Sequence, residues 1–179
     1  MKKNYGISLL LAVLTLWGCG SKKTEAEKEQ REVSLTESID GKKGIQRMKV
    51  STQQNKVKCG GDTYVVNIER CPDEKLPLIH SAAGNYVDNR ITLSVQKDGK
   101  TFFKKSFTRS DFIPYVTFKE TDQFLFEGLV VDEINTEANK ALTFAASLSY
   151  PDSDLYIPFQ ITINKQGKSS ISLDENTHE

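Results

Sequence analysis

The sequence predicts an all-β domain, either an antiparallel two-layer sandwich or a small, partly closed barrel of roughly eight strands. From about residue 45 onward, apolar and polar side chains alternate with the period of two that is typical of half-buried strands. No segment keeps the helical spacing of apolar residues at i, i+3, i+4 and i+7 over three turns. The chain contains 9 Phe and 6 Tyr, enough aromatic side chain to fill the core of one such domain.

The C-terminal third shows the alternation most clearly. Short turns join three alternating runs, which are residues 141–150, 155–164 and 169–173. Successive strands joined by short turns predict an antiparallel meander. Pro158 cannot donate a ladder hydrogen bond, so we expect its strand to be an edge strand or to carry a bulge. Further strands are expected at 63–70, 115–118 and 124–133, with one helical turn at 110–113.

A second hairpin carries the candidate partner contact. Residues 91–95 alternate, and the Asp98-Gly99 pair that follows is the preferred centre of a type I′ turn, in which both residues take positive φ. On the return strand Phe102 and Phe103 are adjacent, so strict alternation points their rings to opposite faces. We expect one ring in the core and the other on the surface, as part of a contact for an anionic, partly apolar partner. The candidate residues are Phe102, Phe103, Lys104 and Lys105.

Residues 1–18 resemble a bacterial lipoprotein signal peptide. Lys2 and Lys3 supply the positive n-region, and residues 7–16 form an apolar run about half as long as a bilayer-spanning helix. The run ends in Leu-Trp-Gly-Cys at 16–19, which resembles the lipobox of these proteins. The resemblance implies cleavage just before Cys19, a diacylglyceryl group on its thiol and an acylated amino terminus. An ordinary cleaved signal peptide with Cys19 as a free thiol is the alternative.

Residues 19–44 are expected to form a flexible tether between the lipidated cysteine and a single β domain over 45–179. Charged residues dominate 22–32 without apolar periodicity, so this stretch cannot bury enough surface to offset its ordering entropy. Gly20 follows the cysteine, where the usual inner-membrane retention signal has Asp. The first acidic residue is Glu25, further from the cysteine than in the surface-exported lipoproteins of Bacteroidetes-type bacteria. We therefore expect an outer-membrane protein that faces the periplasm, with cell-surface exposure as the alternative.

With Cys19 lipidated, Cys59 and Cys71 are the two remaining cysteines, and an oxidising envelope compartment favours a disulfide between them. Closing a loop of this length would contribute about 3 kcal/mol. However, residues 63–70 alternate as a strand, and eight extended residues span more than about 20 Å, whereas a disulfide needs Cα atoms about 4.4–6.8 Å apart. The expected bond therefore requires the chain to loop back at Gly60-Gly61 or to bend near Cys71.

Composition argues against several other functions. The chain has 24 basic and 24 acidic residues, and this balance argues against nucleic-acid binding. With 2 His and 3 Cys it has little material for a zinc site, and it lacks a glycine-rich phosphate loop. His80 is not accompanied by the G-x-S-x-G elbow of a serine hydrolase, and Asp152 and Asp154 lie in a turn without the EF-hand pattern. We therefore expect no cofactor, no metal and no enzymatic activity.

Three segments of the domain, residues 64–73, 86–93 and 102–107, are similar to uncharacterised lipoproteins of Bacteroidetes-type gut bacteria. These families consist of domains of unknown function, so the resemblance implies an envelope location without implying catalytic residues. The leading hypothesis is a lipid-anchored, non-catalytic β domain that binds a protein, peptide or glycan partner in the envelope. The alternative is a carrier that holds a hydrophobic ligand, such as a lipid, in a partly closed barrel; a hydrolase is the third hypothesis. The ligand of the carrier would lie among Phe102, Phe103, Phe124 and Phe126.

Overall fold

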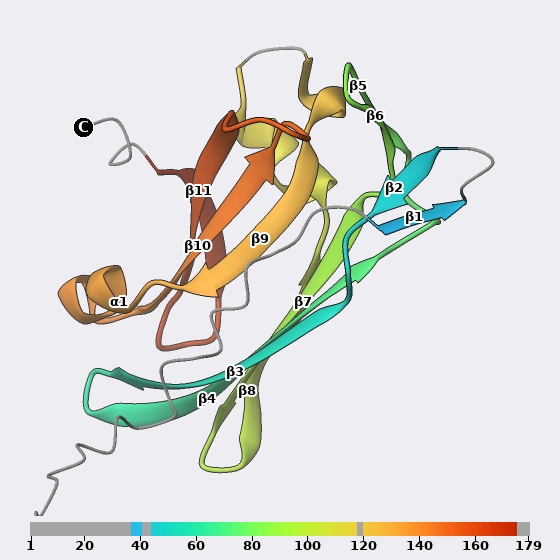
Figure 1. Cartoon of the computed structure of the whole chain (residues 1–179). Helices are drawn as coiled ribbons and strands as arrows, with labels where there is room; N and C mark the ends of the chain where they lie inside the picture. The colour runs from blue at the N-terminus through green and yellow to red at the C-terminus, as the bar shows by residue number, and fades with distance from the viewer. Residues whose placement is uncertain (1–36, 41–43, 118–119, 175–179) are drawn as a thin grey trace, which may run out of the picture. The chain divides into compact units, whose positions relative to one another are not determined.

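The computed structural model describes residues 37–40, 44–117 and 120–174, all within one compact unit, Val33–Glu179 (Figure 1). Of residues 37–40 and Glu120 only the backbone is described. The predicted signal peptide, Cys19 and most of the predicted tether lie outside the described residues.

Strands dominate the described part of the chain. They are β1 (Glu37–Asp40), β2 (Ile45–Arg47), β3 (Ser51–Cys59), β4 (Asp62–Pro72), β5 (Ile79–Ser81), β6 (Gly84–Tyr86), β7 (Asn89–Lys97), β8 (Lys100–Phe107), β9 (Leu125–Val131), β10 (Leu142–Ser149), β11 (Tyr156–Ile163) and β12 (Ser169–Leu173). The helices are all short: η2 (Arg109–Asp111), η3 (Ile113–Tyr115) and η4 (Glu120–Gln123) are 3-10 turns, and α1 (Glu133–Asn139) is α-helical. Strand β1 forms within the stretch predicted to be tether.

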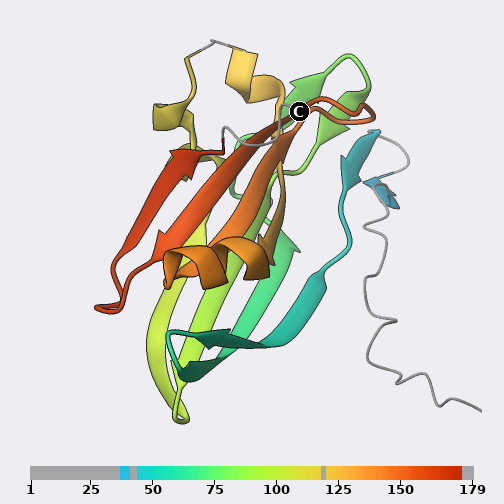
Figure 2. The same cartoon turned by 90° about the vertical axis from the view of Figure 1, so that its left-hand side faces the viewer.

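Two four-stranded antiparallel sheets pack face to face as a sandwich (Figures 1 and 2). The strand order is β3-β4-β7-β8 in one, called here the β3–β8 sheet, and β12-β11-β10-β9 in the other, the β9–β12 sheet. A smaller third sheet, β1-β2-β6-β5, contains the parallel pair β2–β6. None of these sheets closes on itself, so the predicted sandwich is confirmed and the barrel alternative is wrong. The predicted C-terminal meander is confirmed as β10, β11 and β12.

The core lies between the two larger sheets and is closed by an aromatic side chain from the connection after β8. The ring centroid of Phe112 is 4.8 Å from that of Phe126 on β9 and 5.0 Å from that of Phe159 on β11. The turns η2 and η3 hold Phe112 in this place, which confirms the helical turn predicted at 110–113. They also extend to Tyr115, so a strand beginning at that residue is wrong.

Residues with positive φ form the turns of two hairpins in the β3–β8 sheet. Asp98 and Gly99 have φ of 51° and 73°, which confirms the predicted turn between β7 and β8. Gly60 and Gly61 have φ of 59° and 89° and turn the chain from β3 into β4. Glycine takes such angles without the steric cost of a Cβ atom.

Pro158 lies in β11, which is an inner strand and shows no bulge, so the expectation of an edge strand or a bulge is wrong. The last register pair between β11 and β12 is Phe159 with Leu173, one residue away from the proline. The Pro158 carbonyl accepts from the N–H of Asp174, the residue just after β12, at 3.1 Å. The nitrogen of Pro158 points to the same side as its carbonyl, and therefore toward the end of β12. The missing N–H therefore affects only the end of the β11–β12 ladder.

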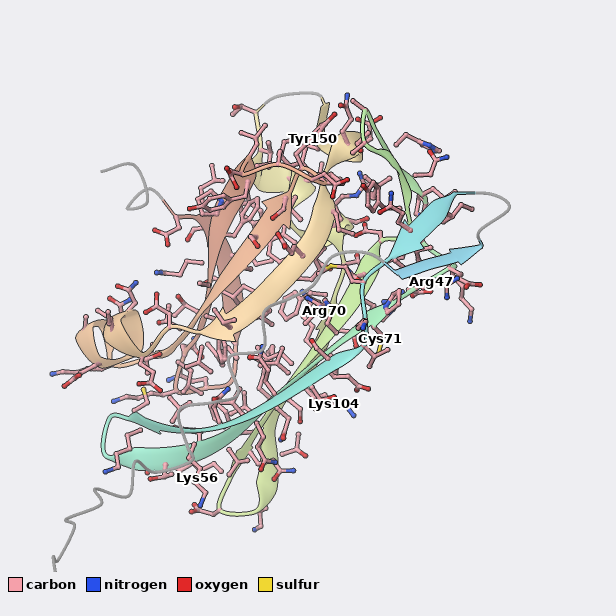
Figure 3. The ribbon with its side chains drawn as sticks, in the orientation of Figure 1. Arg47, Lys56, Arg70, Cys71, Lys104 and Tyr150 are labelled. Carbon is pink, nitrogen blue, oxygen red and sulfur yellow. The ribbon has the colours of Figure 1, made fainter. Side chains whose placement is uncertain are left out.

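Side chains from the facing sheet cover the free edge of β9. Asn89 donates from Nδ2 to the Phe126 carbonyl at 3.0 Å, and the Asp88 carboxylate accepts from the Phe126 N–H at 2.9 Å. Arg70 on β4 donates to the Glu127 carbonyl at 3.0 Å, and Figure 3 shows it at this junction. Main-chain groups that would otherwise be unpaired in the interior are thus satisfied, and the two sheets are joined.

Asp88 is the central acceptor of this junction and is 2% exposed. Its carboxylate also accepts from the Asn89 N–H at 2.8 Å, and its second oxygen lies 3.4 Å from Nε of Arg109. Arg109 is buried as well and donates to the Thr121 carbonyl at 2.9 Å. Burial raises the pKa of the Asp88 carboxyl, while the two backbone donors and Arg109 act in the opposite direction. Asp88 and Arg109 therefore form a buried ion pair with further hydrogen bonds on both sides.

Candidate functional site

The predicted contact at the start of β8 is not a single exposed patch, because a bulge interrupts the alternation there. Val95 pairs with Phe103 and Gln96 pairs with Thr101, which leaves Phe102 as the extra residue. In a bulge two residues of one strand oppose one on the other, so adjacent side chains no longer take opposite faces. Both phenylalanine rings are half-buried and pack against the core, and the Phe102 ring lies 5.3 Å from that of Tyr64. The expectation of one inward and one outward ring is wrong.

The two lysines that follow have different surroundings. Lys104 is exposed on the outer face of the sheet, opposite Ser94 (Figure 3). Lys105 pairs with the buried Leu93, so it points toward the core side, where Nζ lies 3.1 Å from the Asp111 carboxylate. Its ammonium is also 4.5 Å from the centroid of the Phe107 ring. The structure therefore divides Phe102, Phe103, Lys104 and Lys105 between the core and the surface.

The predicted disulfide is also wrong, because Cys59 and Cys71 are both free. Cys59 ends β3 and pairs with Asp62, whereas Cys71 lies near the other end of β4 and pairs with Arg90. Strand β4 runs without interruption, so the two thiols are separated by roughly 30 Å at about 3.3 Å per residue. The turn at Gly60 and Gly61 reverses the chain before β4 begins and does not return it to Cys71.

His80 and Asp152, the candidates for a hydrolase or a calcium site, both form hydrogen bonds within the domain. His80 Nδ1 lies 2.7 Å from Oδ1 of Asn85 across the β5–β6 hairpin. Asp152 accepts from the Tyr86 hydroxyl at 2.7 Å, and burial together with this bond raises the pKa of Tyr86 to about 12. Among residues 44–117 and 120–174, no group of three His, Cys, Asp or Glu side chains is placed to hold a metal ion.

A cavity of about 750 Å³ lies between the β3–β4 hairpin and α1, and we call it the hairpin groove. Its lining is continuous over residues 56–63, so the groove follows the hairpin from the end of β3 through the turn to the start of β4. Helix α1 forms the other wall. The Asp132 side chain caps its start by accepting from the Asn135 N–H at 2.9 Å, and Lys140 ends it with a φ of 50°.

Both walls of the hairpin groove carry charged residues of both signs, since Asp62 lies on the hairpin and Lys140 at the end of α1. Strand β3 contributes Lys56 and Lys58, both exposed, and has no acidic residue. Helix α1 contributes Glu133 and Glu137, one helical turn apart and also exposed. At the end of the groove Cys59 is buried, and this burial raises the pKa of its thiol. The groove therefore offers charge and main-chain groups for binding, whereas its thiol is poorly suited to act as a nucleophile near neutral pH.

Sequence reasoning missed this groove although two signals pointed toward it. Polar residues occupy the inward positions 51, 53 and 55 of β3, which indicates that this strand lies at the margin of the core. The Gly60-Gly61 pair, which the predicted disulfide would need as a loop, also fits the two-residue hairpin turn that the structure contains. The position of α1 depends on tertiary packing and has no such local signal.

The fold and the groove define an all-β sandwich domain with an open, charged groove at one end. The family model for a domain of unknown function, DUF4738, matches residues 30–171, and the chain belongs to this family. No curated protein matches the chain. Within the described residues, no helix has both the length and the apolar character needed to cross a membrane.

Proposed function

We propose that the chain is a lipid-anchored lipoprotein of the bacterial envelope whose β domain binds a protein, peptide or glycan partner without catalysing a reaction. The observation that carries the proposal is the leader, in which two lysines, a ten-residue apolar run and a lipobox-like sequence ending in Cys19 follow one another. Several acyl chains at Cys19 would give stable anchoring, since one chain alone is marginal. The expected place is the periplasmic face of the outer membrane.

A binding role is supported by the hairpin groove. Its volume falls within the range of ordinary ligand sites, and its walls present charged groups of both signs that are exposed to solvent. The groove lining contains lysines, carboxylates and a shielded thiol, but it lacks a histidine or a hydroxyl group paired with a base. Such a lining suits recognition better than acid–base or nucleophilic chemistry.

The carrier hypothesis receives no support from the described residues. Phe124 and Phe126 are buried in the core, and the rings of Phe102 and Phe103 pack against it. The rings fill the space between the sheets, and the sheets do not close around a ligand. Two cavities at the hairpin end of the domain are lined partly by charged residues.

Membrane fractionation of a Cys19→Ala variant tests the anchor. We expect the wild-type chain in the membrane fraction and the variant in the soluble envelope fraction. Cys71→Ala is the matched control, because it also removes one thiol but leaves the leader intact, and it should stay with the membrane. If Cys19→Ala sediments like the wild type, another part of the chain holds it and the proposal is wrong.

A further inference from the structure

The edge strands of the sandwich differ in how they are protected against pairing with another chain. Strand β8 has a bulge at Phe102 and an inward-pointing Lys105, both of which discourage pairing. The free edge of β9 is covered by side chains of Arg70, Asp88 and Asn89. Strand β12 has only five residues.

Strand β3 lacks most of these features. It has nine residues, contains no proline, and keeps an unbroken register with β4 from Ser51 to Cys59. Within the described part of the chain no residue pairs with its outer edge. Its two outward lysines are of the kind that protects edge strands, and α1 contacts the strand at its groove end. The last four residues of β3, 56–59, also line the hairpin groove.

We propose that the outer edge of β3 receives an extended polypeptide segment of a partner as an additional strand, with acidic residues at alternate positions. This inference rests on the proposed binding function and names the class of partner. Main-chain hydrogen bonds to the free edge would provide affinity, and side chains at every second position would provide specificity, as in other cases of strand addition.

The charges of the groove determine the expected pattern in the partner. Lys56 and Lys58 are two positions apart, so both point to the outer face, where they would lie opposite residues i and i+2 of an added strand. Opposite charges in such cross-strand positions are stabilising and like charges are destabilising. Glu133 and Glu137 lie on the other wall, so the residues between the acids should be neutral or basic.

The position of α1 is consistent with a slot for one strand. The helix follows β9 and packs against β10, so it lies on the side of β3 that faces the β9–β12 sheet (Figure 2). Val57 and Cys59 point to this side, while Lys56 and Lys58 point away from it. The inner face of an added strand would therefore be covered by α1. Its outer face would be exposed to solvent beside the side chains of Lys56 and Lys58.

Peptide binding to the full-length chain in detergent micelles tests the proposal. The probe is a nine-residue, end-blocked, fluorescently labelled peptide of alternating Thr and Glu, and binding is followed by anisotropy. A Thr/Lys peptide is the charge control. Two N-methylated Thr/Glu peptides are the backbone control. One carries N-methyl groups on the odd-numbered amides and the other on the even-numbered amides. We expect the unmodified Thr/Glu peptide to bind and to slow hydrogen exchange over residues 51–59. At most one N-methylated version should bind, because only one set of alternate amides faces β3, and the Thr/Lys peptide should not bind.

The double variant Lys56→Glu/Lys58→Glu should bind the Thr/Glu peptide at least about tenfold more weakly, because two attractive cross-strand pairs become repulsive. Lys100→Glu/Lys168→Glu is the matched control, since it reverses two exposed charges outside β3 and the hairpin groove, and it should bind like the wild type. Circular dichroism spectra of both variants establish that they are folded.

Several outcomes would overturn the proposal. These are no binding of the Thr/Glu peptide, equal weakening by both double variants, tolerance of both N-methylated peptides, or binding without protection of residues 51–59. Protection of 51–59 that grows with protein concentration in the absence of peptide would instead assign the edge to a second copy of this chain. The peptide measurement does not depend on the lipid, so its failure leaves the anchor unaffected, and failure of the Cys19→Ala test leaves the peptide result unaffected.

Discussion

The buried carboxylate at the junction of the two sheets offers the sharpest test of how the sandwich is held together. Replacing Asp88 with Ala removes the acceptor for the N–H groups of Asn89 and Phe126, at 2.8 and 2.9 Å, and leaves Arg109 buried without a counter-charge. Removing one partner of a buried ion pair costs about 3–5 kcal/mol. Each unsatisfied buried donor adds a penalty of about 1–3 kcal/mol, although such terms are not fully additive.

We therefore expect Asp88→Ala to lower the free energy of unfolding by at least about 3 kcal/mol. Asp62→Ala is the matched control, because Asp62 also pairs with a cation, Lys97, at the shorter distance of 2.6 Å. Both partners of that pair are substantially exposed, so its loss should cost at most about 1 kcal/mol. Burial of the ion pair, rather than the distance between its charges, should determine which of the two variants loses more stability.

Urea denaturation followed by circular dichroism measures both changes, with the m-value checking that the native and unfolded states stay comparable. If Asp88→Ala does not fold, Asp88→Asn keeps an oxygen for the two backbone donors and removes only the charge, so it should give an intermediate loss. A loss below about 1 kcal/mol for Asp88→Ala, or a larger loss for Asp62→Ala, would refute this account of the junction.

Three further predictions concern the β8 bulge, a shielded phenol and the thiols. Phe102→Ala and Phe103→Ala should each cost about 1–3 kcal/mol in urea denaturation, because both rings are half-buried against the core; a loss for only one of them would contradict the bulge. The pKa of Tyr86 is raised to about 12, so the stability linked to this phenol should be complete below pH 10 and should decline as the pH rises toward 12. In absorbance titrations Tyr86→Phe should remove a late-ionising phenol, and an unchanged curve would contradict the shift. Thiol labelling of the native chain without reductant should modify Cys71 before the buried Cys59, and both after unfolding; resistance of both to labelling until reduction would restore the disulfide.

Local patterns were sufficient to predict much of the fold. The period-two runs predicted the β10–β12 meander and the β7–β8 hairpin, because inward-facing positions of a half-buried sheet are fixed by alternation. The Asp98-Gly99 pair determined its turn type through the φ angles that it tolerates. The same reasoning failed at Phe102, because a bulge depends on how two strands fit together, and the sequence of one strand does not reveal it.

The candidate site was harder to predict because its parts are distant in sequence. The hairpin groove combines β3 with α1, which lies more than seventy residues later, and only tertiary packing brings them together. The junction around Asp88 is similar, since its partners lie in β7, η2 and β9. The disulfide prediction failed for a physical reason that the sequence already contained, namely the straight strand between the two cysteines.

The anchor at Cys19 is the central claim, and the mass of the N-terminal peptide tests it most directly. The chain is extracted from membranes of its native host with detergent and digested, and the N-terminal peptide is analysed by mass spectrometry. The proposal predicts a peptide that begins at Cys19 and carries a diacylglyceryl thioether and an acylated amino group. A peptide that retains residues 1–18, or one with an unmodified Cys19 thiol, would contradict it.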